Sequence, residues 1–154
     1  HQGAELRSAT FEANKESLER ALREDSKAIF CIYEGLTARP IGVTALEEIN
    51  QVNSAAEFDI RIGEKDCWGK GYGTETTRLM LDYGFSYLGL HSIRLVVVSN
   101  NERDIRAYSR AGFKHAGRIR EAWRVGSRTY DLIQMDCLAR EFQNPVHLSP
   151  LPTL

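Results

Sequence analysis

The sequence has few cysteines and no long apolar run. Its three cysteines, Cys31, Cys67 and Cys137, are odd in number and widely spaced, which excludes a disulfide framework and the ligand spacing of a metal site. This pattern fits a reducing compartment, so we predict a cytoplasmic protein without a metal. No apolar run approaches the ~18 residues of a membrane span, and no signal peptide is visible. We therefore predict no membrane partner.

The sequence also lacks an excess of charge of either sign. It has 21 acidic and 20 basic residues and a formal net charge of −1. A balanced chain carries no strong field for a polyanion, so we predict no nucleic-acid partner. With 42% hydrophobic and 27% charged residues in 154, a single globular domain over 1–154 is expected. Residues 1–10 and 142–154 are expected to be loose or irregular. The start His1-Gln2-Gly3 has no Met, which suggests a fragment, a processed product or an added remnant.

Apolar periodicity and turn residues divide the chain into helices and strands. Residues 47–54 are polar and are expected to form a loop. Because strands and helices alternate only in the middle, the fold class expected is α/β, an α+β sandwich built on a mixed sheet with flanking helices. The expected order is a helix at 11–23, strands at 27–33, 41–46 and 56–62, a helix at 74–88, a strand at 93–98, a helix at 104–111, and strands at 113–125 and 129–138.

A glycine-rich stretch joins the strand at 56–62 to the helix that follows. It reads Trp68-Gly69-Lys70-Gly71-Tyr72-Gly73-Thr74. Glycines allow close backbone approach, and the free N–H groups of a helix start bind phosphate. A tight turn without a ligand explains the same pattern equally well. The loop has no Gly-Lys-Ser/Thr ending, so it is not a Walker loop, and its glycine spacing is not that of a dinucleotide fold.

The loop resembles the pyrophosphate loop of the GNAT acetyltransferases, Gln/Arg-x-x-Gly-x-Gly/Ala. Trp68 takes the Gln/Arg place and so departs from the pattern. Further along the chain, Asn101, Tyr108 and Gly112-Phe113 resemble a second GNAT signature. The resemblance covers about residues 40–140. It implies acetyl-CoA as co-substrate and Trp68, Gly69, Lys70, Gly71, Tyr72, Gly73 and Thr74 as cofactor-binding residues.

Two further stretches resemble one branch of the family, which acts on ribosomal-protein N-termini and polyamines. They are Leu46–Phe58 and Gly117–Asp131. The family opens with one more strand and helix than this chain shows, so the first strand and helix are expected to be missing. A sheet edge without its usual cover invites pairing, and we therefore predict a homodimer.

Tyr108, Asn101 and Arg110 are the side chains of the second signature that chemistry could use. A phenol near the departing thiolate can protonate it, which makes Tyr108 the expected general acid; a core tyrosine is the alternative. Asn101 is expected to bind the cofactor, because Asp104 is expected to cap the following helix; an Asx turn or cap is the alternative for Asn101. Arg110 is either a phosphate ligand or part of a solvated helix face.

The remaining candidates lie on or before the strand at 56–62. Ile60, Arg61 and Ile62 are expected to pair with the amides of the cofactor through their backbone. The amine acceptor must lose a proton, and Glu57 is the expected base. Glu47 and Glu48 are expected to bind the cationic acceptor, or else they belong to a solvated loop.

The resemblance therefore implies an acetyl-CoA-dependent N-acetyltransferase. A primary amine would attack the thioester directly in a ternary complex, and a backbone N–H of Ile60–Ile62 would stabilise the carbonyl oxygen. The acceptor could be a protein N-terminus, a polyamine or another small amine. The alternative function is a catalytically silent module that binds CoA.

Overall fold

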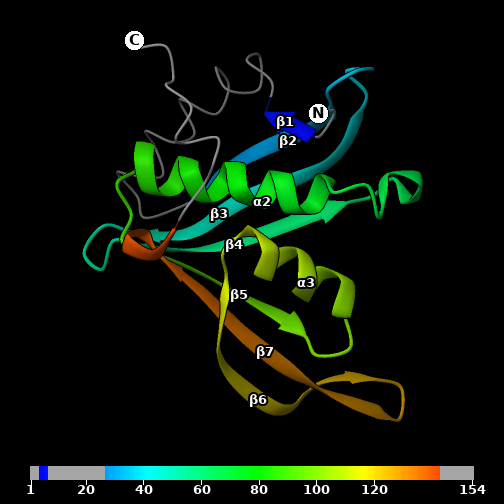
Figure 1. Ribbon diagram of the computed structural model, residues 1–154. Helices are drawn as coiled ribbons and strands as arrows, with labels where there is room; N and C mark the ends of the chain where they lie inside the picture. The colour runs from blue at the N-terminus through cyan, green and yellow to red at the C-terminus, as the bar shows by residue number, and fades with distance from the viewer. Residues whose placement is uncertain (1–3, 7–26, 143–154) are drawn as a thin grey trace.

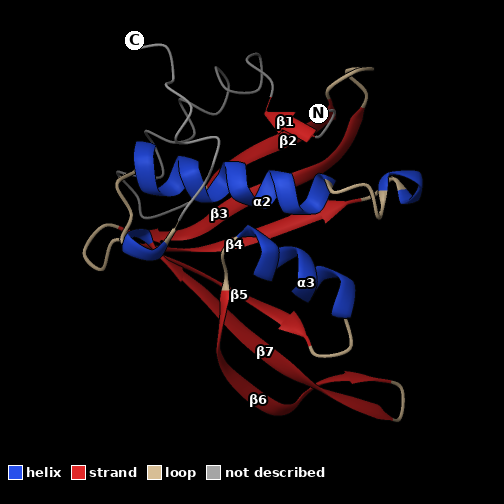
Figure 2. Cartoon of the chain, in the orientation of Figure 1, coloured by secondary structure: helices blue, strands red, loops and turns tan. Residues whose placement is uncertain are grey.

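The computed structural model describes residues 4–6 and 27–142. Seven strands form one sheet in the order β1-β2-β3-β4-β5-β7-β6. Helices α2 and α3 lie on one face of this sheet, and the β6–β7 hairpin extends beyond them (Figure 1). Figure 2 shows the same alternation of strands and helices by colour. The mixed sheet with flanking helices is confirmed.

The strands are β1 (Ala4–Leu6), β2 (Ala28–Glu34), β3 (Pro40–Asn50), β4 (Ala55–Ile62), β5 (Ser92–Val98), β6 (Lys114–Val125) and β7 (Arg128–Leu138). The α-helices are α2 (Tyr72–Asp82) and α3 (Glu102–Ala111), with a π-helical turn η2 (Tyr83–Tyr87) and 3₁₀ turns η1 (Lys65–Cys67) and η3 (Ala139–Glu141). Neighbouring strands are antiparallel except β4 and β5, which run parallel.

The core fills the space between the sheet and the two helices. Alternate residues of the strands are buried there, such as Phe30 on β2, Leu46 on β3 and Ile93 on β5, against Met80 and Leu81 of α2. This alternation is what a sheet with one covered face requires. The odd-numbered positions of β4, including Glu57 and Asp59, consequently point to the face opposite the helices.

Several boundaries differ from the sequence prediction, and three of the differences change a whole segment. Residues 47–50 belong to β3 rather than to a loop, because Ile49 is fully buried and a bulge at Glu47–Asn50 keeps the strand paired. Residues 4–6, expected to be loose, form β1 on the free edge of β2. The helix expected at 74–88 starts at Tyr72 and changes to a π turn at Tyr83. The helix expected at 11–23 lies outside the described residues.

Candidate active site

The strands β4 and β5 pair only at their beginnings. Ala55–Glu57 of β4 lie beside Ser92–Arg94 of β5, and no pair follows. Beyond this point β4 continues along β3 as far as the pair of Ile62 with Gly42, and β5 continues along β7 as far as the pair of Val98 with Leu132. The side of Phe58–Ile62 that faces β5 therefore has no strand partner in the described part of the chain.

The backbone groups that face this gap can be assigned by alternation. The Gly63 N–H donates to the Ile41 carbonyl on the β3 side at 3.0 Å. The Ile62 carbonyl instead accepts from the Trp68 indole Nε1 at 2.8 Å. Because backbone groups alternate sides along an antiparallel strand, the Ile60 N–H and C=O face the gap and those of Arg61 face β3. Of the three predicted backbone ligands, Ile60 has both its N–H and its C=O facing the gap, where no strand within residues 27–142 pairs with them.

A cavity of about 600 Å³ opens at this gap. Its walls come from the end of β4, the glycine-rich loop, the start of α2 and one face of α3. Ten of the predicted site residues line it: Ile60, Arg61, Ile62, Trp68, Gly69, Gly71, Gly73, Thr74, Tyr108 and Arg110. The structure thus brings together side chains that are up to 50 positions apart in the chain.

The glycine loop presents backbone to the cavity. Gly69 and Gly71 have φ of 78° and 83°, in the left-handed region, and a Cβ at either position would meet nothing within 4 Å. Gly71 is the N-cap residue of α2, so the free N–H groups and the positive end of the helix dipole lie at this loop. The loop therefore has both the space and the donors that a diphosphate needs.

Trp68 forms part of the rim of the cavity. Its Nε1 is held by the Ile62 carbonyl, and the Arg103 guanidinium lies over its ring at 4.1 Å from the centroid. This contact is a cation–π interaction between the glycine loop and α3. Trp68 departs from the family pattern, but its ring holds the Arg103 guanidinium near the position where the pattern has Gln or Arg.

Three predicted cofactor residues do not line the cavity: Lys70, Tyr72 and Asn101. The Tyr72 hydroxyl donates to Glu34 Oε2 at 2.6 Å, and this bond raises the pKa of Tyr72 to about 12. The positive charge of Lys70 helps to lower the pKa values of Glu34 and Asp66. Lys70 and Tyr72 therefore belong to the outer side of the loop, away from the cavity.

Asn101 is the N-cap of α3, and the prediction that Asp104 caps this helix is wrong. The Asn101 Oδ1 accepts from the Asp104 N–H at 3.4 Å, and its Nδ2 donates to Asp104 Oδ2 at 2.7 Å. The helix starts two residues before the predicted position, at Glu102. An Asn three residues ahead of an Asp fits the cap at least as well as the Asp does, and the sequence offered no means of choosing between them.

Arg103 and Arg106 are the functional candidates that the sequence reading missed. Both line the cavity with Arg110, because residues three and seven positions apart share one face of a helix. Together with Arg61, four arginines and one acidic residue, Asp104, face the cavity. The helical spacing of these arginines was the signal that could have found them, whereas the overall charge of −1 concealed it.

Tyr108 projects from α3 into the same cavity and is 9% exposed. Its ring packs edge-on against Phe58 and Phe113. Burial raises the pKa of its phenol above the ordinary value, with a smaller effect from the charge of Asp104. The hydroxyl makes no hydrogen bond to any residue within 4–6 and 27–142. It is therefore a protonated donor without a protein acceptor there, which differs from a core tyrosine tied to backbone.

The predicted carboxylates Glu47, Glu48 and Glu57 lie together beside the gap, on the face of the sheet opposite the helices. Glu57 stands opposite Glu47 of β3 and beside Arg94 of β5. Its pKa is raised, first by a hydrogen bond shared with Glu48, then by burial and by the negative charge of Glu48. Glu48 has φ of 48° at the β3 bulge, which places this residue beside Glu57 instead of in a loop. These residues form an acidic cluster at the point where β4 and β5 part.

Two features are absent from the described part of the chain. It contains no group of three or more His, Cys, Asp or Glu side chains placed to hold a metal ion. It also contains no helix with the length and apolar character needed to cross a membrane.

Known proteins resemble this chain in architecture and in sequence. Residues 4–114 match the acetyltransferase (GNAT) domain family. The chain belongs to the GNAT family. It is 34% identical over 113 residues to the spermidine N(1)-acetyltransferase of Escherichia coli (strain K12), an alignment that covers 73% of this chain and 60% of that enzyme. The Vibrio cholerae spermidine N(1)-acetyltransferase is 29% identical over 135 residues, covering 88% and 77%.

Solved structures agree with the sequence comparisons. The crystal structure of the Vibrio cholerae spermidine N-acetyltransferase in complex with CoA and spermine superposes with a TM-score of 0.72 at 28% identity, over 87% of this chain and 78% of that one. A structure of the Vibrio cholerae enzyme described as dodecameric gives 0.71. The chain spans about 60% of the length of the Escherichia coli relative.

Proposed function

We propose that this protein transfers the acetyl group of acetyl-CoA to a primary amine of a polyamine. The observation that carries the proposal is the gap between β4 and β5. A basic, glycine-lined cavity lies on the face of the sheet that the helices cover (the helix side), and an acidic cluster lies on the opposite face (the open side). A polyanionic donor and a polycationic acceptor could then reach one point from opposite faces of the sheet. The membership of the GNAT family and the spermidine acetyltransferase relatives support the same assignment.

The residues present fit acetyl-CoA as the donor. Gly69, Gly71 and the first N–H groups of α2 would hold the diphosphate, and the arginines of α3 would balance the remaining phosphate charge. The gap-facing N–H and C=O of Ile60 would pair with the pantetheine amides. Bound there, acetyl-CoA supplies a thioester carbonyl as the electrophile, and the chain has to activate an amine and protonate a thiolate.

Glu57 and Tyr108 would perform these two proton transfers. The Glu57 carboxylate accepts a proton from the ammonium of the acceptor, directly or through a water, and leaves a lone pair for attack on the carbonyl carbon. As the new C–N bond forms and the C–S bond breaks, the phenol of Tyr108 donates its proton to the sulfur. The raised pKa of Glu57 moves it toward that of a useful base, and the raised pKa of Tyr108 means that its phenol carries a proton at neutral pH.

Glu47 and Glu48 would bind a second ammonium of the polyamine. The basic residues of the β6–β7 hairpin do not oppose this. Arg128 is eight residues from Asp136, which pairs with the Arg94 beside Glu57, and eight strand residues span roughly 26 Å. Arg118 is paired with Asp131. The cationic tip of the hairpin is thus remote from the acidic cluster.

A thiol-release assay with a panel of amines tests the proposal. Spermidine and spermine are expected to release CoA from acetyl-CoA faster than an alanine-starting peptide or an aminoglycoside. Faster release with the peptide would overturn the polyamine assignment. Binding of acetyl-CoA without release for any amine would instead identify a silent CoA-binding module.

We also propose that the protein assembles as a homodimer. The edge strand β6 is exposed along nearly its whole length and presents Ile119, Trp123 and Val125 to solvent within the described structure. Exposed edges and apolar side chains favour pairing with a second copy. Light scattering at micromolar concentration is expected to give twice the monomer mass, and a cooperative monomer would refute the proposal.

A further inference from the structure

The outer side of the glycine loop is attached to the rest of the molecule by one arginine. Arg39 lies in the turn between β2 and β3, and its guanidinium reaches the segment that leads into the loop. It donates to Asp66 Oδ2 at 2.9 Å, to Glu64 Oε1 at 3.5 Å and to Cys67 Sγ at 3.2 Å. All three acceptors precede Trp68, the first residue of the loop.

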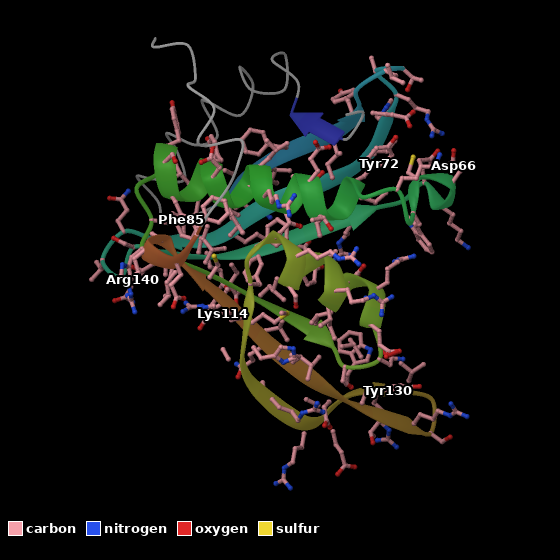
Figure 3. The ribbon with its side chains drawn as sticks, in the orientation of Figure 1. Asp66, Tyr72, Phe85, Lys114, Tyr130 and Arg140 are labelled. Carbon is pink, nitrogen blue, oxygen red and sulfur yellow. The ribbon has the colours of Figure 1, made fainter. Side chains whose placement is uncertain are left out.

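The other end of the loop is attached to the same turn. The Tyr72 hydroxyl donates to Glu34 Oε2, while Glu34 Oε1 accepts from Thr37 and lies 3.8 Å from Arg39 Nε. Glu34 is the last residue of β2, so Arg39 and Glu34 flank one hairpin turn. Figure 3 shows the labelled Asp66 and Tyr72 at the same end of the molecule. The loop is thus fixed at its beginning through Arg39 and at its end through Glu34.

Between these two ends, within the described residues, the loop makes no comparable side-chain attachment. Gly69 and Gly71 face open space where a side chain would be, and the contact of Trp68 with Ile62 and Arg103 involves the loop's first residue only. Glycines in the left-handed region have many alternative conformations when nothing fixes them. The geometry of the backbone donors must therefore be maintained from the two ends of the loop. There Cys67 and Tyr72 pack into a buried cluster with Ile32 and Ile41, and the polar network of Arg39 and Glu34 fixes the outer side.

We infer that Arg39 and Glu34 are positioning residues that hold the glycine loop in its phosphate-binding conformation. The inference rests on the proposed use of acetyl-CoA. Neither residue lines the cavity, so neither touches the cofactor. Their effect is on the fraction of molecules whose loop is already in the binding conformation, and the apparent dissociation constant rises as this fraction falls.

The charges of the network are consistent with this role. The Arg39 bond lowers the pKa of Asp66, and the Tyr72 bond lowers the pKa of Glu34. Both carboxylates are therefore ionised at neutral pH and accept these bonds fully. Arg39 has several acceptors in a fork geometry that a lysine ammonium does not reproduce.

The test compares Arg39→Ala, Arg39→Lys and Tyr72→Phe in the full chain. Calorimetry with acetyl-CoA is expected to show about tenfold weaker binding for Arg39→Ala, as for a loop that is one-tenth populated, and a smaller loss for Arg39→Lys and Tyr72→Phe. At saturating acetyl-CoA the kcat is expected to stay within about twofold of the wild type. Because Arg39 and Tyr72 share Glu34, the double variant is expected to be non-additive.

Arg118→Ala is the matched control, since it removes an arginine–carboxylate pair from the other hairpin without touching the loop. It is expected to leave acetyl-CoA affinity unchanged. Hydrogen exchange of 64–71 gives a second readout: Arg39→Ala is expected to speed exchange, and acetyl-CoA to restore protection.

Two results separate the inference from the proposed function. A wild-type protein that does not bind acetyl-CoA would refute the function. A wild type that binds and turns over, with Arg39→Ala of equal affinity, would overturn the positioning role. So would an Arg39→Ala variant whose kcat and melting temperature fall while KM stays constant, because that pattern indicates a purely structural residue.

Discussion

The two faces of the sheet at the β4–β5 gap present different chemical groups. The helix side uses backbone, positive φ and the three arginines of α3 that line the cavity, whereas the open side uses carboxylates clustered around Glu57. Positive and negative fields therefore meet at one gap in a chain whose net charge is −1. The difference shows that the net charge of the chain predicts the charge of neither proposed ligand, because each face of the sheet would bind a ligand of the opposite sign.

The largest effect is expected from blocking the helix side. Gly71→Val would place a β-branched side chain at φ of 83° and fill the space above the loop. We expect acetyl-CoA binding to fall at least about 100-fold, measured by calorimetry. Gly73 has no positive φ, and its Cβ would approach only Ala107 at 4.0 Å. Gly73→Val is therefore expected to weaken acetyl-CoA binding only by occupying space that the diphosphate needs, without straining the backbone.

Gly126→Val is the matched control for the glycine prediction. Gly126 has φ of 62° and equally open surroundings, but it lies in the turn between β6 and β7. It has the same backbone strain without a ligand nearby. Retained acetyl-CoA binding in Gly71→Val, or an equal loss in Gly126→Val, would refute the assignment of the loop to phosphate.

The next effect tests the acid on the helix side. Tyr108→Phe removes a hydroxyl that has no acceptor among the described residues and keeps the ring between Phe58 and Phe113. We expect kcat to fall by about one to three decades, kcat/KM to fall with it, and acetyl-CoA affinity to stay nearly constant. A normal kcat with a lowered melting temperature would make Tyr108 a structural residue.

The base on the open side has an effect of similar or smaller size. Glu57→Gln preserves shape and removes the proton acceptor, so we expect a kcat about 100-fold lower and the loss of the acidic limb of the pH–rate profile. Glu121→Gln, on the exposed β6 strand, is the control and is expected to be active. An unchanged acidic limb in Glu57→Gln would assign the limb to another group.

The sequence predicted the helix side better than it predicted how that side is charged. The glycine spacing indicated a turn between β4 and the next helix, and the family resemblance indicated its ligand; the structure adds the positive φ and open space at Gly69 and Gly71. The arginines of α3 were missed, since their common face depends on where the helix starts, and the cap at Asn101 rather than Asp104 decided that. Tyr72 was placed in the cavity because its sequence neighbours are there, although its side chain points to Glu34.

On the open side, pairing supplied what the sequence could not. Glu47 and Glu48 read equally well as a solvated loop, and only the buried Ile49 and the bulge of β3 bring them to Glu57. The register of β3 with β4 depends on contacts that are distant in sequence. The separation of β4 from β5 after Glu57 is likewise a property of the sheet.

The smallest effect sharpens the role of the acidic cluster. Glu48 raises the pKa of Glu57 through a shared hydrogen bond and by its charge. In Glu48→Gln the amide can donate to an ionised Glu57, so the pKa of Glu57 falls and the acidic limb of kcat/KM moves to lower pH. A carboxyl whose pKa is raised on folding contributes stability below its unfolded value of 4.5, and this contribution is lost as the pH rises through the folded value. Glu48→Gln is therefore expected to raise the melting temperature at pH 7 by about 1–3 °C, the effect of one surface charge interaction, and to have little effect near pH 4. The same Glu48→Gln variant also tests the division of binding between the two faces. Its KM for spermidine is expected to rise a few-fold, while its KM for acetyl-CoA stays constant, because only the open side has lost a charge. An acidic limb that stays in place, or a change in the KM for acetyl-CoA alone, would show that the two sides of the gap are not divided in this way.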